Sequence, residues 1–169
     1  MPLTSTQLYV KNILDGLLVP GATAPLQAWV TPPVLEDLDG PVAIVQGARL
    51  RVNRQTAPRR AGFKRLAWTV DVYLAYETTP DSETVDLEFP QIIDAVMGAL
   101  WKVSIPTFID PLGNVLGTAP DVLPDGSSQI WNTGEDLELE YPPERVPATL
   151  RMLYYAARLG VDIEEVVQA

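Results

Sequence analysis

The sequence predicts an α+β fold, in which a mixed, mainly antiparallel β-sheet with a long β-hairpin arm is flanked by an N-terminal helix and a central amphipathic helix. Apolar residues alternate with polar ones over residues 42–52 and 65–77, which predicts two long strands. Apolar residues spaced by three and four positions between Phe89 and Leu100 predict the central helix. The chain has 169 residues, the length of one domain, so we expect a single domain over residues 1–169.

The N-terminal helix is expected at residues 4–18. Its apolar residues fall on one face at helical spacing, and they are Val10, Ile13, Leu14, Leu17 and Leu18. Hydroxyl groups at positions 4–6 can cap the first turn, and Pro20 and Gly21 end the helix. A short extended piece at residues 26–30 follows.

The two long strands enclose a basic segment, about residues 49–65, which we expect to form a hairpin arm. In the first strand the apolar residues stand mostly at even positions, and these are Val42, Ile44, Ala48, Leu50 and Val52. In the second strand every other residue from Leu66 to Tyr76 is apolar. The arm holds seven of the twelve cationic residues: Arg49, Arg51, Arg54, Arg59, Arg60, Lys64 and Arg65. We expect these seven side chains to contact a partner or a neighbouring subunit.

The rest of the chain predicts one helix and several short strands. The central helix should begin after an acidic loop at residues 78–86, with Pro90 in its first turn. A proline- and glycine-rich insertion, about residues 104–128, predicts turns and short strand pieces. Residues 129–131 and 137–141 predict a hairpin. Residues 148–160 suit a helix and a strand buried on both faces equally well, because periodicity alone does not separate the two.

The charge of the chain is divided between two regions. No acidic residue occurs between Asp39 and Asp71, so this stretch carries +7 and the rest of the chain carries −17, within a net charge of −10. Like charges packed this closely repel one another and cost stability. Either an acidic partner surface or the chain's own carboxylates would relieve the repulsion, and the sequence leaves both open.

The residue types argue against catalysis. The chain has neither cysteine nor histidine, so disulfides, thiolate or imidazole zinc sites and histidine-assisted nucleophiles are excluded. The acidic residues of 81–86 and 135–144 have the pattern of solvated loops and strand faces. We therefore expect no enzyme, no cofactor and no metal.

Two further motifs are interpreted as turns. Four oxygen-bearing side chains could bind calcium, namely Asp110, Asn114, Asp121 and Asp125. Their spacing, however, is not that of an EF-hand loop. The glycines at 113 and 117 lack the Lys-Ser/Thr pair of a phosphate-binding loop. No apolar run approaches the ~20 residues that cross a bilayer, and the N-terminus lacks the pattern of a signal peptide. We expect a soluble, intracellular protein with no membrane contact.

Two stretches resemble tail terminator (tail completion) proteins of long-tailed bacteriophages. The first joins the strand LAWTVDVYLAY at residues 66–76, through the acidic loop, to the helix FPQIIDAVMGAL at residues 89–100. The second is the terminal stretch LYYAARLGVDIEE at residues 153–165. The resemblance covers about residues 60–103 and 145–166. Residues 112–131 have no counterpart in the family.

The resemblance implies a fold, an assembly and a location. The fold is a mixed α+β subunit that ends in a β-strand, so it favours a strand at residues 148–160. The subunit forms a ring, usually a hexamer, on the head-proximal end of the tail tube, where it stops tube polymerisation and provides the docking surface for the head-tail connector or neck. The implied partners are further copies of the chain, the tail tube protein and the neck proteins, with DNA passing only transiently through the lumen. Assembly takes place in the host cytoplasm, and the product is part of the virion.

Two other functions fit the same residues. A head-completion or connector ring protein of the same neck would have the same size, acidity and lack of catalytic groups. A nucleic-acid-binding module would use the basic arm for phosphate contacts, and its affinity would fall steeply with salt.

Overall fold

A computed structural model describes most of the chain as an α+β fold with a curled, mixed sheet and two helices, which confirms the expected α+β class. The described residues are 5–19, 24–31, 40–53, 63–78, 83–101, 107–118, 128–131, 137–140, 146–149 and 152–168. The helices are α1 (Ser5–Leu14) and α2 (Glu83–Trp101). The strands are β1 (Gln27–Trp29), β2 (Val42–Asn53), β3 (Phe63–Thr78), β4 (Thr107–Ile109), β5 (Val115–Gly117), β6 (Ser128–Trp131), β7 (Leu137–Glu140), β8 (Val146–Thr149) and β9 (Met152–Gln168).

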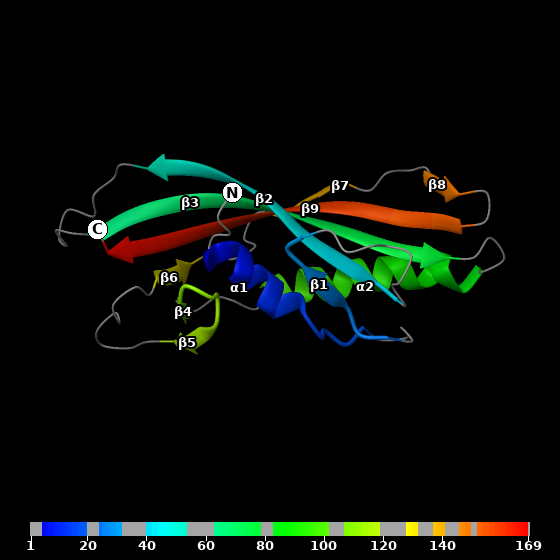
Figure 1. Cartoon of the computed structure of the whole chain (residues 1–169), viewed down its shortest axis with the longest axis horizontal. Coiled ribbons are helices and arrows are strands. Elements are labelled where there is room, and N and C mark those ends of the chain that lie inside the picture. Colours follow the sequence, from blue (N-terminus) through cyan, green and yellow to red (C-terminus); the bar gives the residue numbers. More distant parts are fainter. Residues whose placement is uncertain are drawn as a thin grey trace.

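One sheet contains all the strands, in the order β1-β2-β3-β9-β6-β4-β5, with β7 and β8 also paired to β9. The β1–β2 pair is parallel, whereas the other pairs are antiparallel. The long central pair, β3 and β9, runs from Phe63 opposite Gln168 to Thr78 opposite Leu153. At about 3.3 Å per residue, sixteen paired residues of β3 make the molecule roughly 50 Å long along the strands (Figure 1).

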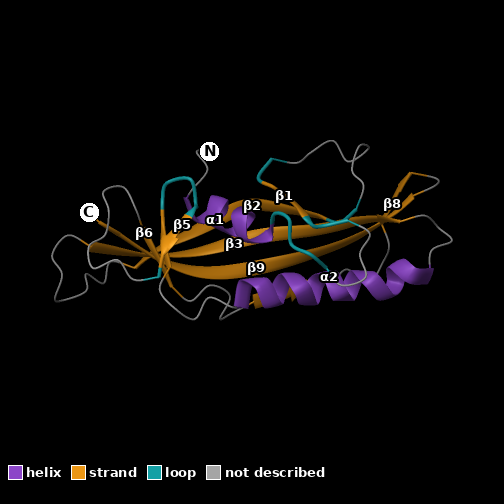
Figure 2. Cartoon of the chain, turned by 90° about the horizontal axis from the view of Figure 1, so that it is seen from below, coloured by secondary structure: helices purple, strands orange, loops and turns teal. Residues whose placement is uncertain are grey.

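The core lies between the sheet and the two helices. Both helices lie on the same side of β3 and β9, and α2 runs beside the half of the sheet away from the C-terminus (Figures 1 and 2). The helices contribute Tyr9, Val10, Leu14, Phe89, Ile92, Val96 and Leu100 to this core. The sheet contributes Ala43, Val45, Val70, Val72, Leu74, Ala157, Leu159, Val161 and Ile163. Alternate residues of β3 and β9 are therefore buried, as the predicted alternation in residues 65–77 requires.

The first helix ends earlier than predicted. It stops at Leu14, and the chain turns at Gly16, whose φ of 78° lies in the left-handed region. The Gly16 N–H then donates to the carbonyl of Leu26 at 2.9 Å, and Leu26 N–H donates to Leu17 O at 2.9 Å. Leu17 and Leu18 thus lie outside the helix, because glycine allows the turn and Leu26 supplies the hydrogen-bond partners.

The second helix begins earlier than predicted. Its first residue is Glu83, inside the stretch that the sequence analysis assigned to an acidic loop, and Pro90 lies within the helix and not in its first turn. Acidic residues are favourable at a helix N-terminus, since the helix dipole is positive there. The stretch 83–88 therefore forms the first turns of α2.

A β-bulge interrupts β2, so the apolar even-numbered positions of the sequence do not all share one face of the sheet. The register shifts between Gln46 and Ala48. Before the shift, the odd-numbered Ala43 and Val45 are buried, and they pair with Leu74 and Val72. After it, the even-numbered Ala48 pairs with Val70. A bulge adds one residue to one strand, so it reverses the parity of the residues that face the core.

The predicted hairpin of residues 129–131 and 137–141 was also wrong. Both segments are strands, but in the described residues β6 pairs with the end of β9 (Ser128 opposite Val167) and β7 with its middle (Leu137 opposite Val161). β8 follows on the same edge, with Val146 opposite Tyr154. The long alternating strand β9 offers an edge along which three short strands pair in succession. The C-terminal region that suited a helix or a strand is thus β, with β8 and β9 connected through residues 150–151.

The predicted arm is described only in part. β2 and β3 pair as far as Asn53 opposite Arg65, and residues 54–62 lie outside the described residues. β9 pairs with β3 along this whole stretch, as far as Phe63 opposite Gln168. The described strands of the arm therefore continue into the main sheet through β9 and are not a free two-stranded ribbon.

Candidate functional site

The seven predicted contact residues fall into two groups. Arg49 and Arg51 are in β2, and Lys64 and Arg65 are in β3, at the end of the sheet where β9 reaches its C-terminus. The other three, Arg54, Arg59 and Arg60, lie outside the described residues.

The register sets two of these basic positions in line with acidic positions of β9. One row across three strands is Arg49, Thr69 and Asp162. The next is Arg51, Ala67 and Glu164. Directly paired residues of antiparallel strands share a face of the sheet. The register thus sets two basic and two acidic positions of the same chain on one face of the sheet, with one strand between them.

The sheet face that the helices leave uncovered carries a polar network between β3 and β9. Arg158 Nη2 lies 2.7 Å from Asp71 Oδ1, and Arg158 Nε donates to the same oxygen at 3.1 Å. Thr69 Oγ1 donates to Asp162 Oδ1 at 2.6 Å. Asp71 is only 8% exposed, so its carboxylate depends on the guanidinium of Arg158 for compensation. This network ties the two longest strands together.

A second carboxylate, that of Glu165, is buried on the core side of the sheet at 3% exposure. Its Oε2 accepts hydrogen bonds from Trp68 Nε1 at 2.6 Å and Thr6 Oγ1 at 3.1 Å, and its Oε1 accepts one from Ser5 Oγ at 3.1 Å. These donors connect the start of α1 to β3 and β9. The sequence analysis missed this cluster, although its signal is visible: Glu165 continues the alternation of Ala157, Leu159, Val161 and Ile163 at an inward position.

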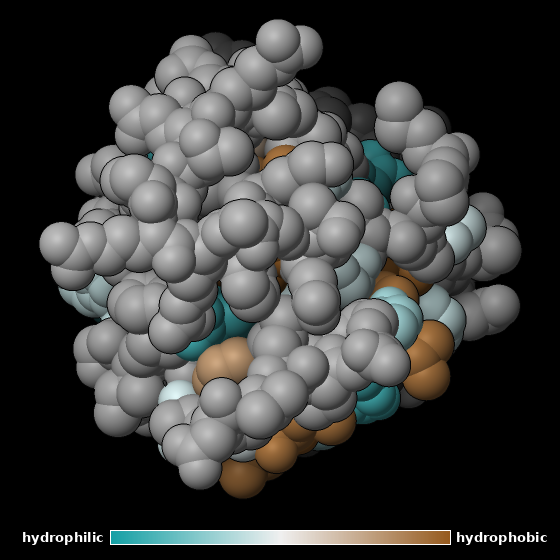
Figure 3. Space-filling view, turned by 90° about the vertical axis from the view of Figure 1, so that its left-hand side faces the viewer, coloured by the Kyte–Doolittle hydropathy of each residue, from teal (hydrophilic) through white to brown (hydrophobic). Residues whose placement is uncertain are grey.

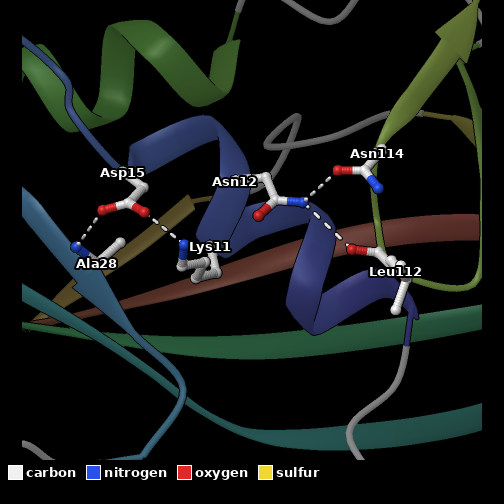
Figure 4. A network of polar contacts seen from close by, with 6 residues as sticks. All are labelled: Lys11, Asn12, Asp15, Ala28, Leu112 and Asn114. Carbon is white, nitrogen blue, oxygen red and sulfur yellow. Dashed lines mark hydrogen bonds and ion pairs between the residues drawn. The ribbon is translucent and has the colours of Figure 1, made fainter.

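Hydrogen bonds connect α1 to neighbouring elements on two sides, β1 and the β4–β5 turn (Figure 4). Toward β1, Asp15 forms an ion pair with Lys11 and accepts the backbone N–H of Ala28 at 3.2 Å. Burial alone raises the pKa of Asp15, but these two hydrogen bonds outweigh it and bring the pKa below its ordinary value. Toward the β4–β5 turn, Asn12 Nδ2 donates to Leu112 O at 3.2 Å. α1 therefore lies between the two outermost strands of the sheet, β1 and β5.

The β4–β5 turn is held by its own hydrogen bonds and by contact with α1. Asp110 Oδ1 accepts the backbone N–H groups of Leu112 at 2.8 Å and Asn114 at 2.9 Å, and Asp110 Oδ2 accepts Asn114 Nδ2 at 2.9 Å. The side-chain and backbone donors of Asn114 lower the pKa of Asp110. Gly113 has φ of 75°, and a Cβ there would lie 2.3 Å from Tyr9 N in α1. The turn predicted at this position is confirmed.

Three large apolar side chains protrude from this ordered turn. Their exposed fractions are 65% for Leu112, 57% for Val115 and 51% for Leu116, and we call these three residues the apolar hairpin. In Figure 3 apolar atoms gather at the lower edge of the molecule's end, the side on which β5 lies in Figure 1. The sequence analysis interpreted this region as a turn only, and the apolar residues between Pro111 and Pro120 were the missed signal. An apolar surface held in place by a rigid turn is typical of an interaction site.

Among the described residues, no three His, Cys, Asp or Glu side chains are grouped so that they could hold a metal ion. Asp110 and Asn114 serve the turn, whereas Asp121 and Asp125 lie outside the described residues. The helices of the described part are too short or too polar to cross a membrane.

Comparison with known proteins does not assign the chain to a family. No protein-family model matches the sequence, and no curated protein matches it either.

Proposed function

We propose that this protein is a structural assembly protein of a long-tailed bacteriophage: a tail terminator that forms a ring on the tail tube, stops tube polymerisation and provides the surface to which the head's neck joins. The proposal rests on the resemblance of residues 66–100 and 153–165 to that family. One structural observation supports it further, namely that the molecule is elongated and carries basic and acidic segments toward opposite ends of its sheet.

The basic end is defined by the register. Lys64 and Arg65 of β3 pair with Val167 and Val166 at the C-terminal end of β9, and Arg51 of β2 pairs with Ala67 of β3. The acidic end lies at the other end of β3, where Tyr76 Oη donates to Glu88 Oε2 of α2 at 3.0 Å. Residues 77–88 contain five acidic residues and no basic one.

Opposite charges at the two ends of a subunit favour head-to-tail association. Such heterologous contacts close into a ring when the rotation between neighbours allows it, and complementary charge orients the partners and speeds their encounter. In the proposed ring the basic segment 49–65 contacts the next subunit or lines the lumen through which DNA passes. Six copies is the stoichiometry that the resemblance implies.

Reversal of charge in the arm tests the proposal. We expect Arg59→Glu combined with Arg60→Glu to abolish ring formation and the capping of purified tail tubes, because both positions would then repel an acidic neighbour. Lys102→Glu is the control, since Lys102 lies outside the arm in the sequence. Full assembly and capping by the double variant would contradict the role of the arm. Binding to portal-bearing heads without capping of tubes would instead identify a connector protein, and salt-sensitive retention on DNA with neither activity would identify a nucleic-acid-binding module.

A further inference from the structure

The outer edge of β1 is covered by a turn of the same chain. Among the described strands, β1 is the last one on its side of the sheet, and its neighbour is β2. Gln27 N–H donates to Pro41 O at 3.1 Å, toward the start of β2. The backbone groups of Leu26 and Ala28 therefore point to the other side, away from β2. On an outermost strand such groups form an open edge that another chain can pair with.

Three residues directly after α1 supply partners for these outward groups. Leu26 N–H donates to Leu17 O at 2.9 Å, and Leu26 O accepts Gly16 N–H at 2.9 Å. Ala28 N–H donates to Asp15 Oδ1 at 3.2 Å (Figure 4). The turn thus takes the place of a further strand, with a side-chain carboxylate as the third partner. We call Asp15, Gly16 and Leu17 the edge cap.

The strand beneath the edge cap has the composition of a strand that pairs readily. No charged residue occurs between Asp15 and Glu36. β1 ends at Trp29, which is 42% exposed, and Val30 follows it. Uncharged segments with aromatic and β-branched residues are the ones that pair with other chains when they lie at an open edge. Without the edge cap, β1 would present such an edge.

We propose that the edge cap prevents β1 from pairing with other chains, and that its release opens β1 to the same strand of a second copy. The occupant follows from the hydrogen-bonding groups. In an antiparallel pair centred on Gln27, Leu26 of one copy lies opposite Ala28 of the other, and each such pair exchanges both of its N–H···O bonds. β1 also contains no charge that would repel its copy. The inference does not depend on the ring function proposed above.

Asp15→Ala tests the inference, and Asp15→Asn is its matched control. Alanine removes the acceptor of the Ala28 N–H group, whereas the amide oxygen of asparagine still accepts it. The chain has no cysteine, so Gln27→Cys introduces a single thiol into each background. In the proposed pair, position 27 lies opposite itself at a Cα separation of about 4.5 Å, which suits a disulfide. We expect oxidation to give disulfide-linked dimers with Asp15→Ala, and none with Asp15→Asn or with Asp15 unchanged.

A second thiol position separates edge pairing from general aggregation. Val115→Cys places a thiol on β5, where Val115 is 57% exposed. Asp15→Ala should not increase the dimers formed through this position. Equal increases at both positions, or no increase through Gln27→Cys, would overturn the inference. Dimers through Gln27→Cys with Asp15 unchanged would mean that the edge is open in the native chain, which would overturn it as well.

Amide hydrogen exchange followed by NMR provides a test that does not rely on the folding of a variant. In the wild type, the N–H groups of Leu26 and Ala28 should be protected although β1 is an outermost strand. Asp15→Ala should make exchange at Ala28 about tenfold faster, as the loss of a hydrogen bond to a charged acceptor predicts, whereas Asp15→Asn should keep most of the protection. Rapid exchange of both amides in the wild type would overturn the closed edge.

Discussion

Replacement of Gly113 by alanine tests whether the β4–β5 turn is built onto α1. The added Cβ would lie 2.3 Å from Tyr9 N and 2.5 Å from Leu8 C. Optimal non-bonded separations are about 3.5 to 4.0 Å, so the overlap exceeds about 1 Å. Both atoms belong to the helix backbone and cannot move aside as a flexible side chain would, so the turn itself must shift. Overpacking of this kind costs about 1–3 kcal/mol, and the positive φ of 75° adds about 1–2 kcal/mol for a residue with a Cβ.

Gly16→Ala is the matched control for this variant. Gly16 has nearly the same φ, 78°, but a Cβ there meets nothing within 4 Å. We expect Gly16→Ala to lower the free energy of unfolding by about 1 kcal/mol and Gly113→Ala to lower it by about 3 kcal/mol. Urea unfolding followed by circular dichroism measures both, with the midpoint and slope read separately. Equal losses in the two variants would refute the close packing of the turn on α1.

Three further predictions concern carboxylates, of which Glu165 and Asp71 are buried and Asp15 is exposed. Trp68→Phe removes an N–H donor of the buried Glu165 carboxylate and should lower the free energy of unfolding by about 1–3 kcal/mol; an unchanged urea midpoint would contradict the bond. Arg158→Met leaves the Asp71 carboxylate without its ion pair, so we expect the free energy of unfolding to fall by about 1–3 kcal/mol. Thermal unfolding measures this change, and Arg158→Lys should recover part of the lost stability. The pKa of Asp15 is lowered from 3.8, so its stabilising effect is complete above that value and is lost as pH falls through the lower pKa of the folded state. Unfolding free energies measured between pH 6 and about 2 should therefore fall less steeply in Asp15→Asn than in the wild type, and equal slopes would argue against this linkage.

The strands that the sequence predicted best are those with long uninterrupted alternation. The pattern from Leu66 to Tyr76 identified β3, and its inward residues Val70, Val72 and Leu74 are buried. Such a pattern follows directly from the two-residue period of a strand. The core face of α2 was predictable for the same kind of reason, since Ile92, Val96 and the other apolar residues recur at helical spacing.

Features that depend on partners distant in the sequence were not predictable. The β6 and β7 strands look like a local hairpin, but they pair with residues of β9 that lie 18 to 39 positions farther along the chain. The parity change at the bulge between Gln46 and Ala48 depends on the register with β3. Leu14 is the last residue of α1 because Leu26 accepts the N–H of Gly16. A pattern among residues close together in the sequence does not reveal which distant residues pair with them.

The candidate site was predicted only in part. The charge pattern drew attention to Arg49, Arg51, Lys64 and Arg65, and the register places these positions together at one end of the sheet. The apolar hairpin at the same end was missed, because short apolar pieces between prolines are typical of buried strands as well as of exposed turns. Only the structure shows that Leu112 and its neighbours are exposed.

Native mass spectrometry over a wide concentration range, with negative-stain imaging of the same samples, tests the central claim most directly. The subunit mass is 18.5 kDa. The account predicts a closed ring near six times this mass, with assembly that weakens as salt screens the charged ends. A monomer at every concentration that also fails to form rings on purified tail tubes would contradict it.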